Sequence, residues 1–338
     1  MTIKRNTKKI VIATRGSKLA MWQANWIKTE LEKKHPGIEV ELKKIKTTGD
    51  KILDVPLAKV GGKGLFVKEI EEALLRGDAD LAVHSMKDVP ADLPAELHIK
   101  AICKRENPRD ALITRVHSYQ FTVHSFNDLP QGTKIGTSSL RRSCQLLNIR
   151  PDLKIAQLRG NLDTRIRKLD EGQFDAIIVA AAGVKRLGMA DRITEILETD
   201  VSLPAIGQGA VGIECRKEDR LISNLLEPLN HPATSVCVRA ERAFLKKLEG
   251  GCQVPIAGYA QLLQQGSGAR GQGSDCELST DNCQLVIDGL VGSVSGDTII
   301  RDSIRGNVDN AEQLGTKLAE ELLSKGAGEI LAEVYNQR

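Results

Sequence analysis

The chain repeats one local pattern: a short apolar stretch, a small polar turn and an amphipathic helix. The first copy is Lys9–Thr14, after which the turn Arg15–Ser17 precedes a helix that is expected to start with Ser17 as its N-cap and to end near Lys34. The pattern returns with strands expected at 134–136, 154–158 and 176–180. Strands that alternate with helices are typical of α/β folds, in which helices cover the faces of the sheet. We therefore expect an α/β protein built on doubly wound mixed sheets.

The chain is long enough for two or three domains, because it has 338 residues. Two polar or Gly- and Pro-containing segments, Arg105–Asp110 and Leu203–Gly209, are interpreted as crossings between two lobes. The strand expected at 210–215 would then return to the first sheet. Strands and helices from 259 to 335 predict a small α+β domain. The expected division is 1–103 with 205–226 for domain 1, 104–204 for domain 2 and 227–338 for domain 3.

Composition argues against several classes of protein. The net charge of +4 is too small to indicate nucleic-acid binding, and no aromatic residues accompany the arginines as single-stranded nucleic acid would require. Seven cysteines without a Cys-x-x-Cys pair predict neither a disulfide framework nor a metal site. No signal peptide is recognisable, and no apolar run approaches the roughly 20 residues of a membrane helix. We expect a cytoplasmic protein without nucleic-acid or membrane partners.

A candidate catalytic carboxylate follows the short apolar strand Leu81–Val83. The strand ends in a polar run that contains Lys87 and Asp88, and Pro90 stops any regular continuation. Open α/β sheets bind ligands at the carboxyl ends of their strands, and a carboxylate there is suited to acid–base chemistry. The alternative is that Lys87 and Asp88 form a solvated loop pair. The strand context favours the catalytic interpretation.

Arginine follows three successive strands in the second half of the α/β region. The basic residues after these strands are Arg141 and Arg142, then Arg159, Arg165 and Arg167, then Lys185 and Arg186. Each set alone fits a solvated helix face. Three sets at one edge of a parallel sheet favour a site for a polyanion. Arg15 adds a further fork of donors near the start of the first helix.

Two loops stand out by their glycines. The segment Thr47–Gly64 is rich in Gly and Lys but lacks the spacing of a phosphate-binding P-loop, so we interpret it as a positively charged lid. Cys252 follows two glycines and precedes Pro255, which predicts an accessible and reactive thiol. Cys103, Cys144, Cys215 and Cys237 are interpreted as buried apolar residues. The segment Gln264–Asn282, rich in Gly, Ser and Gln, predicts a flexible loop.

These features together resemble the porphobilinogen deaminase (hydroxymethylbilane synthase) family. The match runs in order from about residue 9 to residue 335. The motifs that carry it are Ala13–Ser17, Val60–Phe66, His84–Pro90, Gly136–Arg142, Leu158–Asn161, Leu203–Gly209 and Glu249–Pro255. The segment Gln264–Asn282 is longer and richer in Gly and Ser than the family pattern, which leaves the local shape of the third domain open.

The resemblance implies a three-domain transferase whose first two domains look like the lobes of periplasmic binding proteins. It implies a dipyrromethane cofactor bound to Cys252 by a thioether. Porphobilinogen is the implied substrate: four molecules condense in turn onto the cofactor, each releasing ammonia, and hydrolysis then frees the linear tetrapyrrole hydroxymethylbilane. The route is that of haem biosynthesis, and the family expectation is a monomer without a metal.

The resemblance also assigns residue roles by motif. Asp88 matches the catalytic carboxylate. Lys59, Lys63 and Phe66 belong to the lid, and Arg167 has no counterpart and is left as a surface residue. The residues that match ligands of substrate or cofactor carboxylates are Arg15, Ser17, Lys87, Ser139, Arg141, Arg142, Arg159, Arg165 and Arg186.

Two alternatives belong to other functional classes. A non-catalytic two-lobed protein that binds a carboxylate ligand would need the same arginines, but it would have no need of an accessible thiol at Cys252. A nucleic-acid binder that uses the arginine turns is disfavoured by the mild net charge.

Overall fold

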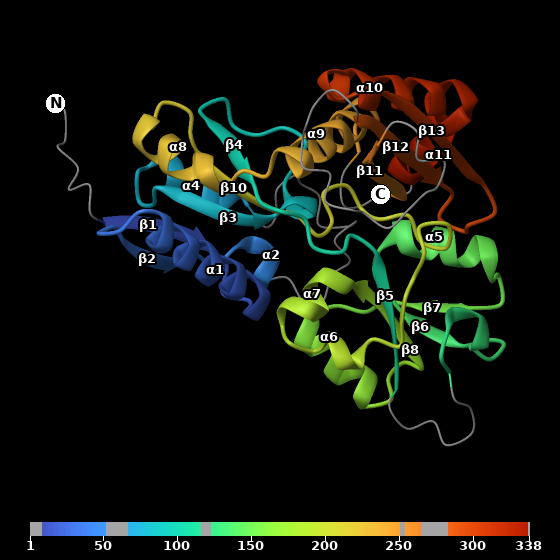
Figure 1. The fold of residues 1–338 in the computed structure, drawn as a ribbon. Helices are drawn as coiled ribbons and strands as arrows, with labels where there is room; N and C mark the ends of the chain where they lie inside the picture. The colour runs from blue at the N-terminus through green and yellow to red at the C-terminus, as the bar shows by residue number, and fades with distance from the viewer. Residues whose placement is uncertain (1–8, 52–66, 116–122, 251–253, 265–282, 337–338) are drawn as a thin grey trace.

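The computed structural model describes residues 9–51, 67–115, 123–250, 254–264 and 283–336. Within them the chain forms two five-stranded sheets and one three-stranded sheet (Figure 1). The strands are β1 (Lys9–Thr14), β2 (Glu39–Lys44), β3 (Leu81–Ser85), β4 (Leu97–Ile102), β5 (Asp110–Thr114), β6 (Lys134–Gly136), β7 (Lys154–Ala156), β8 (Ala176–Ala180), β9 (Glu195–Ile196), β10 (Val211–Arg216), β11 (Ile256–Gln264), β12 (Cys283–Gly292) and β13 (Ile299–Asn307). The α-helices are α1 (Lys18–Lys34), α2 (Thr48–Lys51), α4 (Lys68–Leu75), α5 (Leu140–Ile149), α6 (Leu162–Asp170), α7 (Ala181–Arg186), α8 (Arg220–Leu226), α9 (Pro232–Lys247), α10 (Ala311–Leu322) and α11 (Gly328–Asn336).

Lobe 1 is the sheet β2-β1-β3-β10-β4 with its helices. Strands β1, β2 and β3 run parallel, and β10 runs antiparallel to β3 and β4. Alternate residues of β1 point to opposite faces, so Ile12 packs with Ile27 of α1 while Ala13 packs with Ile70 of α4. Both faces are therefore covered by helices, as the apolar strand pattern predicts.

Lobe 2 is the sheet β7-β6-β8-β5-β9, and it repeats the arrangement of lobe 1. Strands β7, β6 and β8 are parallel, and β5 runs antiparallel to β8. The chain passes from lobe 1 to lobe 2 between β4 and β5 and returns between β9 and β10. Strand β5 follows the first crossing and β10 follows the second. Each is the fourth strand of its sheet and runs antiparallel to the third, β8 or β3. The expected pair of crossings is confirmed.

The C-terminal domain is the antiparallel sheet β11-β12-β13 with helices α9, α10 and α11 (Figure 1). Phe244 of α9 is fully buried in its core, and α10 packs beside α9. A Cβ on Gly289 of β12 would lie only 2.7 Å from the Phe244 ring, so glycine is needed there for helix and sheet to approach closely. This unit confirms the predicted α+β domain.

The predicted elements agree with the structure in type and order. Strands β1, β6 and β8 have the predicted bounds, and Ser17 is the N-cap of α1, where its hydroxyl accepts a hydrogen bond from the Ala20 N–H at 3.3 Å. Of the helices and strands given above, two short ones were not predicted, α2 and the two-residue edge strand β9. The domain boundaries given above stay predictions. Among the described helices, none has the length and apolar composition that crossing a bilayer requires.

Glu241 of α9 ties the C-terminal domain to both crossings between the lobes. Its fully buried carboxylate accepts hydrogen bonds from Arg105 in the first crossing (2.5 and 3.2 Å) and from the Gly207 N–H in the second (2.6 Å). The Ala260 N–H of β11 donates to the same carboxylate at 2.8 Å. Arg105 also donates to the carbonyl of Gln208 at 2.8 Å. One carboxylate thus fixes the two crossings relative to each other.

Glu241→Gln is expected to lower the free energy of unfolding by about 3 to 5 kcal/mol, because the Arg105 charge would stay buried without its counter-charge. Urea unfolding followed by circular dichroism measures the change. The matched control is Glu171→Gln, which breaks the exposed Arg167–Glu171 pair and is expected to shift stability by less than about 0.5 kcal/mol. Equal unfolding midpoints for the two variants would contradict this role of Glu241.

Candidate active site

Asp88 lies just beyond the end of β3, in a single 3₁₀ turn formed by Met86–Asp88. Met86 is buried, and a Cβ on Gly212 of the neighbouring strand β10 would overlap its sulfur atom. The side chain of Met86, packed against β10, therefore anchors the turn. From Val89 the backbone is extended again. Asp88 itself is half-buried and faces a pocket.

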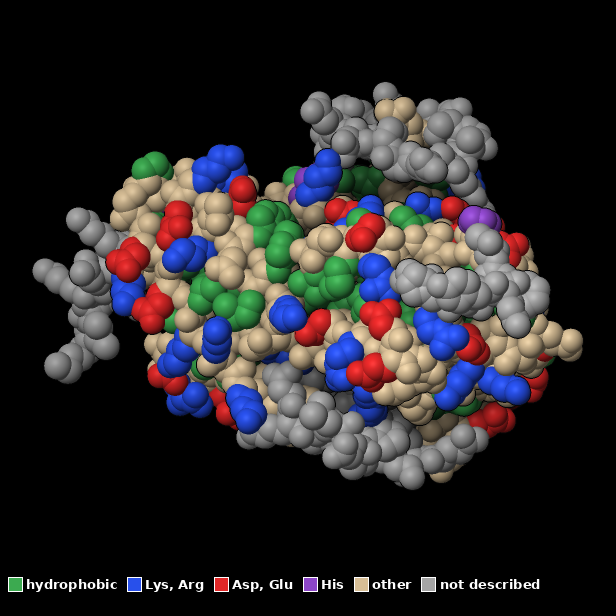
Figure 2. Space-filling view, turned by 90° about the horizontal axis from the view of Figure 1, so that it is seen from below, with side chains coloured by type: hydrophobic (Ala, Val, Ile, Leu, Met, Phe, Trp, Pro, Cys, Tyr) green, Lys and Arg blue, Asp and Glu red, His purple; other side chains and the backbone are tan. Residues whose placement is uncertain are grey.

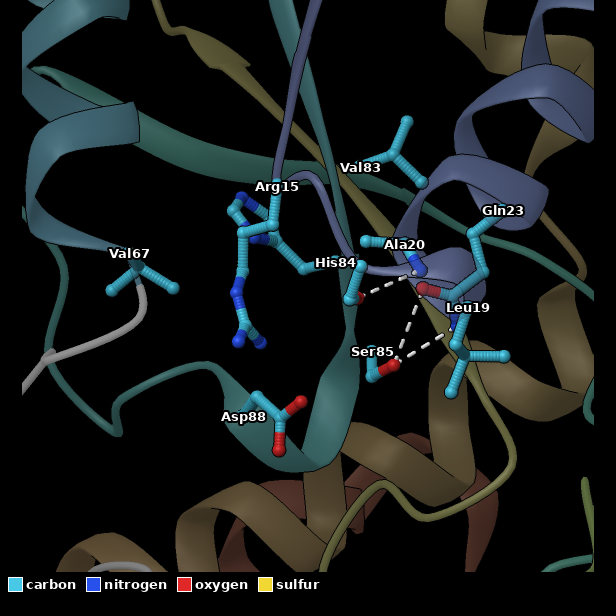
Figure 3. Close-up of a pocket in the computed structure, with 10 residues that line it drawn as sticks. Arg15, Leu19, Ala20, Gln23, Val67, Val83, His84, Ser85 and Asp88 are labelled. Carbon is cyan, nitrogen blue, oxygen red and sulfur yellow. Dashed lines mark hydrogen bonds between the residues drawn. The ribbon is translucent and has the colours of Figure 1, made fainter. Parts of the chain in front are cut away.

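The pocket is formed by the ends of β1 and β3 and by the first turns of α1. In Figure 3 the Arg15 side chain extends toward the Asp88 carboxylate. On the other side of the pocket, Gln23 donates from its amide to the Ser85 hydroxyl at 2.9 Å. The residues that line the pocket are Arg15, Ser17, Leu19, Ala20, Gln23, Val67, Val83, His84, Ser85 and Asp88. Three residues predicted from sequence, Arg15, Ser17 and Asp88, are thus brought together.

A buried polar pair supports this pocket from behind. The Nε2 atom of His84 lies 2.9 Å from Oε2 of Glu214 in β10, and both side chains are almost fully buried. Glu71 of α4 is close enough for burial and the Glu214 charge to raise its pKa to about 7. Sequence reasoning missed Glu214 and Glu71. A charged residue inside the otherwise apolar strand 210–215 was the available signal for Glu214.

The charges of two arginines of lobe 2, Arg142 and Arg165, shift the pKa of Lys87, which lies beside Asp88 in lobe 1. Burial lowers the pKa of Lys87 to about 8, while the charge of Asp88 opposes that shift and the charges of Arg142 and Arg165 add to it. The pKa of Arg165 is lowered to about 10 by burial and by Arg142, and Asp88 again opposes the shift. The loop after β3 in lobe 1 and the helices α5 and α6 in lobe 2 therefore share one electrostatic environment.

Arg141 and Arg142 point into the protein, toward Asp110 at the start of β5. Their side chains are only 5% and 6% exposed. Arg141 donates to Asp110 at 2.7 Å and to the carbonyl of Leu203 at 2.8 Å, and Arg142 donates to Asp110 at 2.7 Å. The structure thus places both residues at the expected edge of the sheet, with Asp110 as an internal partner. Direct binding of a substrate carboxylate by either residue stays a prediction.

The other predicted residues of lobe 2 lie along the same edge. Arg165 donates to the Gly160 carbonyl at 2.8 Å, and Arg186 donates to the Gly209 carbonyl at 2.7 Å. Arg186 also stacks over Trp22 of α1 at 5.7 Å, which links the two lobes. Arg159 and Ser139 are half-buried. Arg167 is exposed and pairs with Glu171, as expected of a surface residue.

Four of the described cysteines are poorly suited to covalent chemistry. Burial raises the pKa of Cys103, Cys144 and Cys237 to about 12 and that of Cys215 to about 11. Thiols with such values stay protonated and unreactive near neutral pH. The interpretation of these four as buried apolar residues is confirmed. Cys252 and the predicted lid residues Lys59, Lys63 and Phe66 lie outside the described residues.

The face of the molecule shown in Figure 2 carries charges of both signs. On the face shown in Figure 2, Lys and Arg side chains alternate with Asp and Glu and do not merge into one basic surface. The cations that share the environment of Asp88 are instead the buried and half-buried ones named above.

Comparison with known proteins identifies the family. Residues 10–224 match the family described as "Porphobilinogen deaminase, dipyromethane cofactor binding domain", and residues 235–324 match "Porphobilinogen deaminase, C-terminal domain". The chain is 54% identical over 330 residues to porphobilinogen deaminase of Geotalea uraniireducens, covering 98% of this chain and 96% of the relative. It is 56% identical over 326 residues to that of Geobacter sulfurreducens, covering 96% and 95%.

Solved structures give a looser likeness. The methionine-binding protein MetQ aligns with 66% of this chain and 90% of its own, at 15% identity and a TM-score of 0.42. The BvgS periplasmic VFT2 domain of Bordetella pertussis aligns with 65% of this chain and 86% of its own, at 15% identity and a TM-score of 0.38. The family assignment rests on the sequence matches. By those matches, which cover nearly the whole chain, the protein belongs to the porphobilinogen deaminase family.

Proposed function

We propose that this chain is a porphobilinogen deaminase (hydroxymethylbilane synthase). It joins four porphobilinogen molecules head to tail on a dipyrromethane primer held at Cys252, releases ammonia at each addition, and frees hydroxymethylbilane by hydrolysis. The observation that carries the proposal is the placement of Asp88 beside Arg15, in one electrostatic environment with Lys87, Arg142 and Arg165.

The residues present fit a dipyrromethane group. Each of its two pyrroles bears an acetate and a propionate, so it is a polycarboxylate. The charges that shift the pKa of Lys87 are those of Asp88, Arg142, Asp110 and Arg165, so within this set of described residues three cations, Lys87 included, face two carboxylates. The excess positive charge suits an anionic ligand. When bound, the cofactor supplies a covalent primer with a nucleophilic pyrrole carbon.

Asp88 is proposed to act at the aminomethyl carbon of porphobilinogen. It donates a proton to the departing amine, so that the C–N bond breaks and ammonia leaves. Its carboxylate then faces the cationic azafulvene and stabilises that charge. Asp88, left as a carboxylate, would also be placed to accept the proton that the pyrrole α-carbon of the chain loses once the new C–C bond has formed. Arg15, at the mouth of the same pocket, is suited to hold a carboxylate of the incoming substrate.

Lys87 is expected to limit activity at alkaline pH. Its folded-state pKa is about 8, below its ordinary value, so the free enzyme loses this cation as pH rises through that value. Carboxylate binding needs the charged form, and kcat/KM for porphobilinogen should therefore fall above pH 8. The measurement is kcat/KM from pH 6.5 to 9.5 for wild type and Lys87→Arg, because arginine stays charged throughout. An identical alkaline fall in both proteins would contradict this assignment.

A direct assay tests the function. Purified protein is incubated with porphobilinogen, and ammonia and linear tetrapyrrole are measured together. The proposal predicts four ammonia molecules for each tetrapyrrole. Binding of porphobilinogen without release of ammonia would favour the alternative, a non-catalytic carboxylate-binding protein.

The compartment, the pathway and the oligomeric state of the enzyme are proposed by analogy with the same family. We expect it to act in the cytoplasm, in haem biosynthesis, as a monomer. The three-domain division 1–103 with 205–226, 104–204 and 227–338 is kept as part of the proposal. Sedimentation of the purified protein tests the oligomeric state.

A further inference from the structure

Asp110 occupies an unusual place for a carboxylate. It is the first residue of β5, opposite Ala180 at the end of β8, and so it lies at the edge of the sheet where the parallel strands of lobe 2 end. Its side chain is fully buried. A buried carboxylate is costly unless it is paired and hydrogen-bonded. Its partners therefore explain why it is there.

Both oxygens of Asp110 are fully engaged. Oδ2 accepts from Arg141 at 2.7 Å and from the Ser202 hydroxyl at 2.8 Å. Oδ1 accepts from Arg142 at 3.0 and 2.7 Å and from the Gln208 amide at 2.9 Å. Arg141 and Arg142 are thereby held by one carboxylate, while Ser202 and Gln208 fix that carboxylate from the segment that crosses back to lobe 1.

The two arginines would not adopt this arrangement unaided. Consecutive residues on a helix point about 100° apart, and like charges repel. A single acceptor between them is what lets both guanidinium groups turn inward. Burial alone would raise the pKa of Asp110, but the charges of Arg141 and Arg142 hold it well below its usual range. The carboxylate therefore stays ionised, and the three groups together retain one positive charge.

This cluster also acts on Lys87 across the contact between the lobes. The charge of Asp110 raises the pKa of Lys87, opposing burial and the charges of Arg142 and Arg165, as Asp88 does. Asp110 thus moderates the repulsion between Lys87 and the arginines that approach it from lobe 2.

We propose that Asp110 is a positioning residue of the active site: by orienting Arg141 and Arg142, it sets where the carboxylates of the dipyrromethane and of the growing pyrrole chain bind. Asp110 itself touches no reacting atom. The inference rests on the proposed function, since it concerns the same anionic ligand.

The test compares Asp110→Asn and Asp110→Glu with Ser202→Ala. The first variant removes the charge, the second keeps the charge but displaces it, and the third removes one hydrogen bond from the same carboxylate. Intact mass measures cofactor loading, thermal unfolding measures integrity, and kcat/KM for porphobilinogen is recorded against pH.

Asp110→Asn is expected to lower cofactor loading and to reduce kcat/KM by about 10-fold or more, the effect of losing charged hydrogen bonds. The alkaline limb of its kcat/KM profile should move to lower pH, because the Asp110 charge no longer raises the pKa of Lys87. Asp110→Glu should recover part of kcat/KM and keep the alkaline limb of wild type. Ser202→Ala should lower kcat/KM less than Asp110→Asn does, because it removes one hydrogen bond of the Asp110 carboxylate and leaves both arginine pairs in place.

Two results would overturn the inference. One is a folded Asp110→Asn with full loading, kcat/KM within about twofold of wild type and an unmoved alkaline limb. The other result concerns Asp110→Glu and decides the question if Asp110→Asn does not fold. If Asp110→Glu equals wild type in cofactor loading and in kcat/KM, the placement of the two arginines does not matter. A wild-type protein without adduct or turnover would contradict the proposed function itself, and this inference with it.

Discussion

Replacing Asp88 by asparagine is expected to lower the turnover of porphobilinogen by at least about 100-fold, the usual contribution of a general acid. Asparagine keeps the shape of the side chain but can neither donate the proton that the departing amine requires nor offer a negative charge to the azafulvene. The pocket around it, with Arg15 and the Gln23–Ser85 pair, is expected to stay intact. Cofactor loading should therefore be preserved better than turnover.

Asp78→Asn is the matched control for this variant. Asp78 lies in the turn before β3 and forms exposed ion pairs with Arg76 and Lys43. Its replacement removes the same charge from the same lobe but away from the pocket, and turnover should stay within about twofold of wild type. Turnover rates and the intact mass of each protein are compared. Normal turnover by Asp88→Asn would rule out Asp88 as the catalytic acid.

Cys252→Ala is expected to abolish covalent attachment of the dipyrromethane and, with it, synthesis of the tetrapyrrole. The alanine side chain offers no sulfur for a thioether. The thiols of Cys103, Cys144 and Cys237 are no substitute, because burial holds them in the protonated form. Intact mass and a porphobilinogen assay measure the two losses separately.

Cys237→Ala serves as the control for loss of a thiol. Cys237 is buried in α9, in the core of the C-terminal domain, and its replacement should cost stability but leave the adduct in place. An adduct that survives in Cys252→Ala and is lost in Cys237→Ala would show that the attachment site was assigned to the wrong residue.

Much of the fold could be predicted from local pattern. Strands β1, β6 and β8 are short apolar runs bounded by polar turns, and the hydroxyl of Ser17 marks the start of α1. The two short elements α2 and β9 were missed because four and two residues are too few to show a periodicity. Edge strand β9 is defined by its pairing with β5, a contact that no local pattern encodes.

The site could be predicted in its parts but not in its connections. The motifs place Arg15, Lys87 and Asp88 correctly at the ends of β1 and β3. Arg141 and Arg142 also lie at the predicted edge, but their partner Asp110 is about 30 residues away in sequence and belongs to a different strand. Likewise, the partner of His84 is Glu214, which only the return of the chain to lobe 1 brings beside it. Pairings of this kind depend on tertiary packing, and neither periodicity nor composition reveals them.

Cys252 is proposed to carry a dipyrromethane primer beside a catalytic site centred on Asp88. The most direct measurement is the intact mass of the purified protein, followed by mapping of the peptide that contains Leu248–Pro255. We expect an added mass of two linked pyrrole units on Cys252. Protein that makes linear tetrapyrrole from porphobilinogen while Cys252 is unmodified would contradict it.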